Sequence, residues 1–436
     1  MRFPAALLAI PMLASAQQPL TMFEAHLASG KAAIQQSRYQ EAGRQLRDAI
    51  DDVARLDQND PATATRGAEA RETLCDLDVL TGQYDEAISL EEAAISALEK
   101  TLGPDSTDLV SHLARLAGVY RAGGKTPKAE PVLQRVIALD IRALGPDDNK
   151  VASDYDLLAA TYMEMDSLRE AIATYQKGLT ARMNHGGADQ IEIATSYTNL
   201  AIAQERDQNF HEARTDFEKA LAISEKKLGD ENYSLTGILD RLGLMLRRLR
   251  NYGEAEPVLQ RALAIREKTL GARHSDVALA LDNLALTYFY DTKYMEAEPL
   301  FTRSLKIWQA TQGLDSPLVA QALDNLGALY SAQQKYDQAE PLFKRALSIR
   351  EKQDIESLSN LALVYEAKND PKNADLFFQR ALLIGDKPLG SERLEISETL
   401  TNYETFLRAT GRIAEARKIA ARLRDMKSSE IKEPTR

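Results

Sequence analysis

Apolar residues recur along this chain at helical spacing, in pairs of stripes separated by short polar breaks. Within one segment, Val277, Leu281, Leu284, Ala285 and Tyr288 follow each other at the spacing of one helix face. After a polar break, a second stripe is formed by Tyr294, Ala297, Phe301, Ser304, Leu305 and Trp308. The segment predicts two amphipathic helices joined by a short turn. No stretch of useful length alternates with the period of two that a half-buried strand requires, so we expect essentially no β-sheet.

The two-helix pattern repeats every 42 residues. An alanine marks it at Ala87, Ala129, Ala171, Ala213, Ala255, Ala297 and Ala339. Ala42 lies 45 residues before the first of these, and Ala374 and Ala416 follow after steps of 35 and 42. Such units bury their apolar faces by stacking on one another. About ten units therefore predict an all-α solenoid.

Two small-residue signals set the expected helix ends. Glycines at 42-residue steps, at 103, 145, 187, 229, 271 and 313, and a further one at 390, are predicted to end the second helices in a left-handed conformation. Prolines two residues after the repeat alanine are predicted to lie in or just past the first turn of the second helix, where the missing N–H is mostly unpaired: Pro131, Pro257, Pro299 and Pro341.

One unit is shorter than the others. The step from Ala339 to Ala374 lacks seven residues, close to two helical turns. We predict that the helix ending near Lys352 and the helix beginning near Ile355 are each shortened by about one turn, with an irregular curvature there.

The residues resemble the tetratricopeptide repeat family. Its leucine position reads Leu74, Leu116, Leu158, Leu200, Leu242, Leu284, Leu326 and Leu361. The next position is small, reading Gly30, Cys75, Ala117, Ala159, Ala201, Gly243, Ala285, Gly327 and Ala362, as two closely crossing helices require. We interpret Cys75 as a buried small residue rather than a reactive thiol.

The 42-residue period resembles the lengthened repeat of kinesin light chains. The matching motifs are Asp-Asn-Leu-Ala at 282–285, Tyr-Met-Glu-Ala-Glu-Pro at 294–299 and Ala-Ile-Arg-Glu-Lys-Thr-Leu-Gly at 264–271. The resemblance implies a right-handed superhelix whose inner wall consists of first helices and holds an extended peptide. The architecture and the peptide groove are carried over, while a motor role is not expected.

The chain ends suggest how the array is bounded. An apolar run at 3–13, followed by Ala14-Ser15-Ala16, has the pattern of a secretory signal peptide cleaved after Ala16. We therefore expect residues 1–16 to be a signal, 17–426 the array and 427–436 a polar tail. An exported, periplasmic or secreted protein follows, or a cytoplasmic one if the run is not a signal. Glu404 at a small-residue position makes the last repeat atypical, as a capping repeat would be.

Composition excludes several classes of function. The net charge of −11 disfavours bulk nucleic-acid binding, and no later stretch is apolar enough to span a membrane. The five histidines are scattered without metal-ligand spacing, and neither a phosphate-cradling loop nor a nucleophile elbow is present. We expect neither enzyme activity nor a cofactor nor a metal.

The position just before the repeat leucine is expected to face the groove. Over the second half it reads Asn199, Arg241, Asn283, Asn325, Asn360 and Asn402. Each amide offers a donor and an acceptor, so the row could pair with the peptide groups of an extended ligand. Alternatively, these side chains bond local backbone or the neighbouring aspartates Asp240, Asp282 and Asp324, and serve only to hold the array together.

A group of arginines lies beside that row. Arg241, Arg247 and Arg248 are predicted to approach the inner wall, with Arg206 and Arg250 nearby. There they would attract an acidic peptide or a terminal carboxylate through charge-assisted hydrogen bonds. Phe289 and Tyr290 could add an apolar pocket. In the alternative interpretation the arginines form a solvated face paired with acids such as Glu205 and Asp207.

Two functions remain open at this stage. The first is a peptide-binding scaffold that uses the groove and carries its site at Asn199, Arg241, Arg247, Arg248, Asn283, Asn325, Asn360 and Asn402. The second is a structural subunit of an envelope complex that uses its convex face or ends. In both, the partner is a protein or peptide, and we expect the chain itself to be a monomer.

Overall fold

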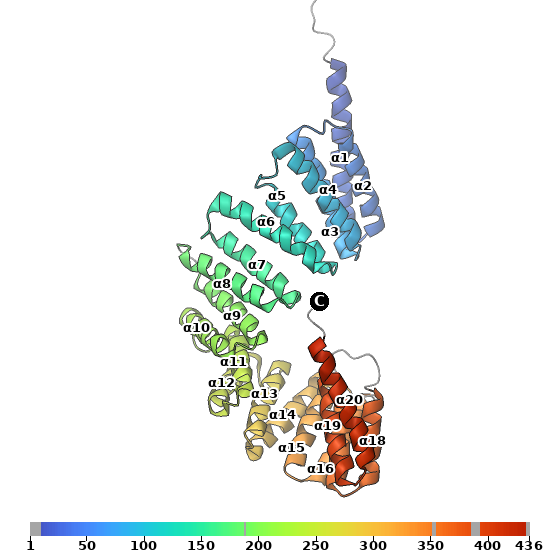
Figure 1. Cartoon of the computed structure of the whole chain (residues 1–436). Helices are drawn as coiled ribbons and strands as arrows, with labels where there is room; N and C mark the ends of the chain where they lie inside the picture. The colour runs from blue at the N-terminus through green and yellow to red at the C-terminus, as the bar shows by residue number, and fades with distance from the viewer. Residues whose placement is uncertain (1–9, 187–188, 351–354, 385–392, 433–436) are drawn as a thin grey trace, which may run out of the picture. The chain divides into compact units, whose positions relative to one another are not determined.

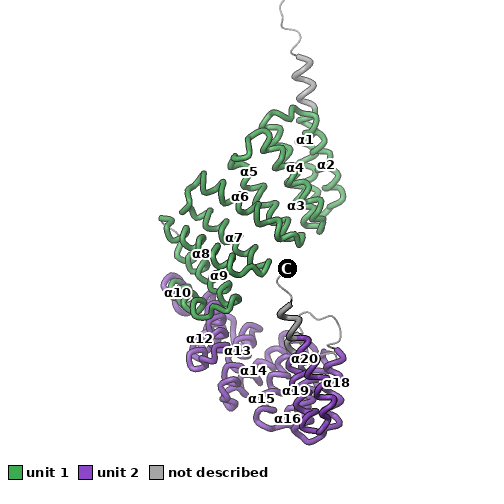
Figure 2. Tube along the Cα trace, viewed as in Figure 1, with its two compact units in different colours: residues 1–223 green, residues 224–436 purple. Residues whose placement is uncertain are grey.

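The computed structural model describes residues 10–186, 189–350, 355–384 and 393–432. The chain divides into two compact units, residues 1–223 and 224–436 (Figure 2). Within the described residues there are twenty α-helices, one short 3-10 helix and no strand.

The first unit contains nine complete helices and most of a tenth (Figure 1). Their bounds are α1 Ile10–Gln35, α2 Tyr39–Ala54, α3 Pro61–Leu80, α4 Tyr84–Leu102, α5 Leu109–Ala122, α6 Thr126–Leu144, α7 Asn149–Glu164, α8 Leu168–Asn184, α9 Gln190–Arg206 and α10 Phe210–Leu228.

The second unit begins within the last turns of α10 and continues through the remaining helices. After the 3-10 helix at Tyr233–Leu235 these are α11 Thr236–Arg248, α12 Tyr252–Leu270, α13 Ser275–Tyr290, α14 Tyr294–Gln312, α15 Pro317–Ala332, α16 Tyr336–Ile349, α17 Ile355–Ala367, α18 Pro371–Ile384, α19 Arg393–Ala409 and α20 Ile413–Lys432.

Consecutive helices form the predicted pairs, one pair for each repeat. In the second unit, α13 packs on α14 within one repeat, and α14 packs on α15 of the next. First helices also contact first helices, as α11 does α13, α13 does α15 and α15 does α17. Each unit is therefore an α-solenoid with first helices lying side by side, which confirms the predicted fold class.

The small-residue position brings the two helices of a repeat close together. A Cβ atom added to Gly243 would lie 2.5 Å from a Leu259 side-chain carbon, and one added to Gly327 would lie 2.8 Å from the Phe343 ring. Cys75 occupies the same position and is fully buried. Burial raises the pKa of its thiol to about 12, so the interpretation as a packing residue is confirmed.

The glycines that end second helices adopt a positive φ, but their ψ differs from the expectation. Gly271 has φ 84° and ψ 153°, and Gly313 has φ 86° and ψ 162°. The left-handed helical region has ψ near 47°, so these residues occupy the extended positive-φ region instead, which is essentially restricted to glycine. Of the glycines named above, those at 187 and 390 lie outside the described residues.

The turn inside each repeat carries a left-handed residue that the sequence pattern did not reveal. Its φ lies between 57° and 62° at Ser37, Asp166, Gln208, Arg250, Thr292, Gln334 and Asn369. In one such turn the Lys293 amide donates to the Tyr288 carbonyl at 2.8 Å, and the Thr292 amide donates to the Phe289 carbonyl at 3.0 Å. These bonds close the first helix in the manner of a Schellman motif and offset the strain of a β-branched residue there.

The repeat prolines lie deeper in the second helix than predicted. Pro257 is the sixth residue of α12, which continues unbroken to Leu270. At that depth an amide would bond to the carbonyl four residues earlier, so the expectation that the missing N–H was mostly unpaired is wrong. The prolines still follow the helix start without ending the helix.

The shortened unit is confirmed at both of its helices. α16 has 14 residues, whereas α14 has 19, and α17 has 13, whereas α15 has 16. The predicted end near Lys352 falls outside the described residues.

The terminal helices cross two of the predicted boundaries. α1 begins at Ile10 and runs past Ala16, and α20 continues to Lys432, beyond the expected start of the tail. Among the described helices, none has the length and apolar character that crossing a bilayer demands.

Candidate functional site

The predicted asparagine row lies on first helices, one residue before each repeat leucine. In the second unit, Asn283 lies on α13, Asn325 on α15, Asn360 on α17 and Asn402 on α19, and all four side chains are half-buried. Because α13 contacts α15, α15 contacts α17 and α17 contacts α19, the four amides lie on adjoining helices. Asn199 has the same place on α9 of the first unit.

Most of these amides keep their hydrogen-bonding groups available. Asn325 accepts a long hydrogen bond of 3.4 Å from Gln321. Within the described part of the chain, the side chains of Asn199, Asn283, Asn360 and Asn402 form no hydrogen bond. A half-buried amide without a protein partner can bond to water or to a ligand.

The neighbouring aspartates are engaged elsewhere, so they do not hold the asparagine row. Asp240 accepts from Arg266 at 3.0 Å, and Asp282 accepts from the Trp308 indole at 2.8 Å. Asp324 accepts from Arg350 at 2.5 Å. Arg266 and Trp308 lie on the second helix of the same repeat, and Arg350 directly follows the end of that helix in its repeat.

Arg247 of α11 contacts the neighbouring first helix α13. Its guanidinium donates to the backbone carbonyl of Asn283 at 3.4 Å, and its carbon centre lies 5.9 Å from the Tyr290 ring centroid. Tyr290 meets Phe289 edge-on at 5.4 Å, and Phe289 lies 5.8 Å from Tyr294. Burial lowers the pKa of Arg247. The arginine therefore sits on an aromatic face, a position suited to a carboxylate that would compensate its lost hydration.

The other arginines of the group behave differently from one another. Arg241 and Arg248 are exposed on α11, and Arg250 is the left-handed residue of the following turn. Arg206, in the first unit, donates to Asp166 at 2.7 Å and to the Met163 carbonyl at 3.1 Å. Its acidic partner is thus in the preceding repeat.

The structure also contains buried ion pairs that the sequence analysis missed. Arg182 donates to Asp156 at 2.8 Å, as Arg266 does to Asp240 and Arg350 does to Asp324. In each pair the arginine follows the aspartate by 26 residues, and the pairs recur at every second repeat. That recurrence is a sequence signal that could have revealed them. They join the two helices of one repeat and are structural, because a buried acid of this kind needs a partner.

Family models match most of the chain. Two models, both described as tetratricopeptide repeat, cover overlapping segments at 68–142, 108–184, 150–226, 192–268, 234–294, 276–352 and 357–392. The chain belongs to the tetratricopeptide repeat family. The fold of this family is typical of protein–protein interaction.

Several solved structures are similar to parts of this chain. The apo form of RapI is 15% identical with a TM-score of 0.50 over 65% of this chain and 99% of RapI. BtubC (BKLC) from P. vanneervenii is 24% identical with a TM-score of 0.46 over 52% of this chain and 91% of BtubC. The TPR-like repeats of a kinesin light chain candidate from Podosopora anserina are 23% identical, with a TM-score of 0.42 over 46% and 95% of the two chains. No curated protein matches the chain by sequence.

Histidines in this tetratricopeptide array have structural contacts. His112 lies 3.1 Å from the buried carboxylate of Glu91, and His26 lies 2.7 Å from Asp52. The His274 ring accepts from the Asp276 amide at the start of α13. Within the described ranges, no group of three or more histidine, cysteine, aspartate or glutamate side chains could hold a metal ion.

Proposed function

We propose that the second unit of this tetratricopeptide protein binds an extended peptide along its first-helix wall. The observation that carries the proposal is the row of half-buried amides on the adjoining first helices α13, α15, α17 and α19, in which the side chains of Asn283, Asn360 and Asn402 form no hydrogen bond. An extended peptide presents N–H and C=O groups alternately, and an amide side chain can pair with either. The asparagine row would bind the backbone of the peptide and would discriminate little between peptides of different sequence.

The arginine end of the wall gives this peptide a preferred charge. Arg247 is partly desolvated against Tyr290 and contacts the α13 carbonyl of Asn283. An acidic side chain or a terminal carboxylate placed there would form a charge-assisted hydrogen bond in a site of reduced hydration. We therefore propose an acidic or carboxylate-terminated segment as the ligand.

A binding assay with peptide probes tests the proposal. The probe is a fluorescein-labelled acidic decapeptide with a free carboxyl terminus, selected from an array, with affinity measured by fluorescence anisotropy. We expect Arg247→Ala and Asn283→Ala each to weaken binding at least tenfold. N-methylation of alternate peptide groups in the probe should have a similar effect, since it removes the backbone donors.

A matched control separates groove binding from general charge attraction. Arg142→Ala removes the same charge from the exposed Arg142–Asp105 pair in the first unit. It should leave affinity within about twofold, because exposed pairs contribute little. If the groove variants bind like this control, the groove proposal fails, and a structural role through the other surfaces becomes the better account.

We also propose that the protein is exported, on the basis of the signal-like pattern that ends at Ala14-Ser15-Ala16. Amino-terminal sequencing of the protein recovered from the exported fraction should give Gln17 as the first residue. Recovery of a cytoplasmic protein that keeps residues 1–16 would refute export without affecting the groove proposal.

A further inference from the structure

A tyrosine fills the same space between successive repeats at several places in the array. It lies four residues after the repeat leucine on a first helix, and it reaches the second helix of the preceding repeat. Its hydroxyl donates to the glutamate that follows the repeat alanine there, at 2.9 to 3.0 Å in the pairs Tyr162–Glu130, Tyr288–Glu256, Tyr330–Glu298 and Tyr365–Glu340. Ring and carboxylate together close the interface.

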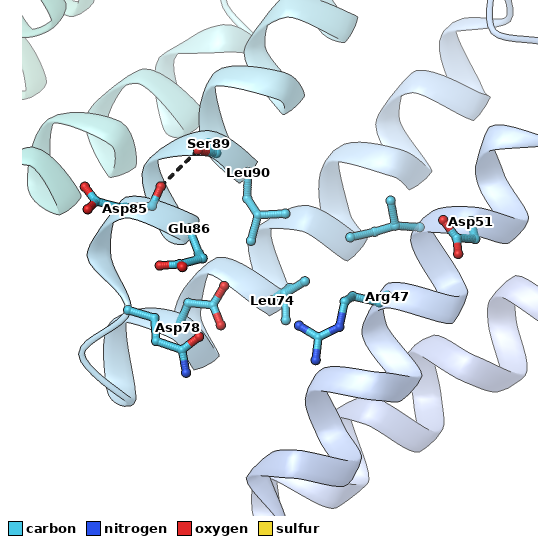
Figure 3. Close-up of a pocket in the computed structure, with 10 residues that line it drawn as sticks. Arg47, Asp51, Leu74, Asp78, Asp85, Glu86, Ser89 and Leu90 are labelled. Carbon is cyan, nitrogen blue, oxygen red and sulfur yellow. Dashed lines mark hydrogen bonds between the residues drawn. The ribbon is translucent and has the colours of Figure 1, made fainter.

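The interface between the first and the second repeat lacks both members of this contact. Asp78 stands at the tyrosine position, and Gly43 stands where the glutamate would follow the repeat alanine Ala42. A cleft of about 540 Å³ lies beside Asp78 and is lined by residues of α2, α3 and α4 of the first unit (Figure 3). Most of its lining residues lie on the second helices α2 and α4 or just before α4, and the cleft belongs to a different unit from the wall of Asn283, Asn325, Asn360 and Asn402.

Asp78 is the distinctive group in this cleft. Its residue is only 5% exposed and lines the cavity, yet in the described structure its carboxylate forms neither a hydrogen bond nor an ion pair. Burial raises the pKa of Asp78, the charge of Arg47 lowers it, and the charge of Glu86 raises it. A buried carboxylate without a partner is costly, and a cation entering the cleft would relieve that cost.

The rest of the lining adds apolar walls and further negative charge. Ile50, Leu74 and Leu90 contribute aliphatic surface, and Asp51 and Glu86 contribute carboxylates. A ligand that suits this lining has a cationic end and an aliphatic stem. Such a stem can bury its methylene groups against apolar surface while its charged head meets the acids.

Asp85 and Arg47 also line the cleft, and their charges determine which acidic groups a ligand can reach. Asp85 is already ion-paired with Lys125, the residue directly before α6 in the next repeat. Arg47 is the one basic residue of the lining, and it lies beyond ion-pair distance of Asp78. Arg47 therefore supplies a partial counter-charge that an incoming cation would have to displace.

We propose that this cleft binds the side chain of a lysine or arginine in a partner peptide. Asp78 and Glu86 receive the cationic head, and Ile50, Leu74 and Leu90 cover its aliphatic stem. The site is on a different unit from the peptide wall and selects the opposite charge, so either proposal can fail without the other.

The test uses the full chain and an alanine-rich, amidated hexapeptide with one central lysine, labelled with fluorescein and followed by anisotropy at low ionic strength. Replacing that lysine by norleucine should weaken binding at least tenfold, because only the head group changes. Asp78→Asn should weaken binding of the lysine peptide by a similar factor. Arg47→Gln should tighten it severalfold, since the competing internal cation is gone.

Controls keep the result interpretable. Asp105→Asn removes an equal charge from an exposed site of the same unit, and it should change affinity by less than twofold. Asp78→Asn removes an unpaired buried charge, so it should leave the fold intact, and circular dichroism checks this. Arg47→Gln is expected to bind the lysine peptide more tightly, a result that a damaged fold could not produce. Equal binding of the lysine and norleucine peptides would overturn the proposal. Displacement of the peptide by 1,5-diaminopentane at lower concentration than by the lysine peptide itself would also overturn it, in favour of a free diamine.

Discussion

The α12–α13 interface and the α2–α3 interface each join the second helix of one repeat to the first helix of the next. They differ in the side chains at two equivalent positions. In the second unit, Tyr288 fills the space and bonds to Glu256. In the first unit, Asp78 and Gly43 occupy those two positions and leave a cleft with a buried, unpartnered carboxylate. The difference shows that a stacked repeat tolerates the loss of a ring and its partner, because neighbouring contacts hold the helices in place. Two substitutions can thus convert a packing position into a binding position.

The variant with the largest expected effect places an aspartate, the residue type found at the α2–α3 interface, at the α12–α13 interface. Tyr288→Asp should lower the free energy of unfolding of the second unit by about 3 to 5 kcal/mol, since it removes a buried ring and leaves an acid in its place. Urea unfolding followed by fluorescence of Trp308, the single tryptophan of the chain, measures the change.

Tyr288→Phe is the matched control for that variant. It keeps the ring and removes only the hydroxyl that donates to Glu256, so it should cost about 1 kcal/mol. If Tyr288→Asp is no more destabilising than Tyr288→Phe, the ring does not hold this interface together and the comparison loses its basis.

A second test compares two buried acids. Asp282 of α13 accepts from Ser304 and, at 2.8 Å, from the Trp308 indole, whereas Asp78 has no such donors. Burial still raises the pKa of Asp282 to about 6, although the two hydrogen bonds act to lower it. Because the folded pKa lies above the ordinary value of 3.8, the folded state holds the proton more tightly than the unfolded state.

The resulting stabilisation is complete below about pH 4 and is lost as pH rises through about 6. We expect the second unit to be less stable at pH 7.5 than at pH 4.5 by about 2 kcal/mol from this group. Trp308 fluorescence should titrate with a midpoint near 6. Asp282→Asn should abolish that titration and the difference in stability between pH 4.5 and pH 7.5. If the titration persists in the variant, another group is responsible for it.

The smallest effect is expected from the reverse substitution in the first unit. Asp78→Tyr restores the residue type found at five other interfaces and fills the cleft, so it should stabilise the first unit by about 1 kcal/mol. Hydrogen exchange of the α2–α4 region measures this locally. Asp78→Asn, which removes the charge without supplying a ring, is the control. Faster exchange in Asp78→Tyr than in the unmodified protein would show that the space does not accept a tyrosine.

The sequence predicted those features that each depend on a local, repeated pattern. The helix pairs, the buried leucines and the small residue at Gly243 follow from spacing within one repeat, and the structure confirms them. The positive φ of Gly313 was predictable because only glycine adopts it easily. Its ψ was not, since the direction of the following loop depends on contacts beyond the helix end.

The features that escaped prediction involve pairs of residues or departures from the pattern. The Asp240–Arg266 pair joins two helices and becomes visible only when positions 26 residues apart are compared. Asp78 alone does not indicate a missing contact. That becomes visible only when Asp78 is compared with the tyrosines at equivalent positions and with Gly43 one repeat earlier. Of the candidate wall, the association of Arg247 with Asn283 could be predicted from helix register, whereas the engagement of Arg206 with Asp166 required the geometry of the preceding repeat.

The tyrosine–glutamate contact also bears on how such a chain changes length in evolution. Tyr288 and Tyr330 are equivalent, and each pairs with the glutamate one repeat earlier. Deleting the 42 residues from 275 to 316 would bring Tyr330 opposite Glu256 and recreate the same junction. Unequal crossing-over within the second unit would thus yield shorter or longer arrays that still fold. The same event next to Asp78, with loss of the repeat that carries it, would place Tyr120 opposite Gly43, so the ring would meet no carboxylate at that junction.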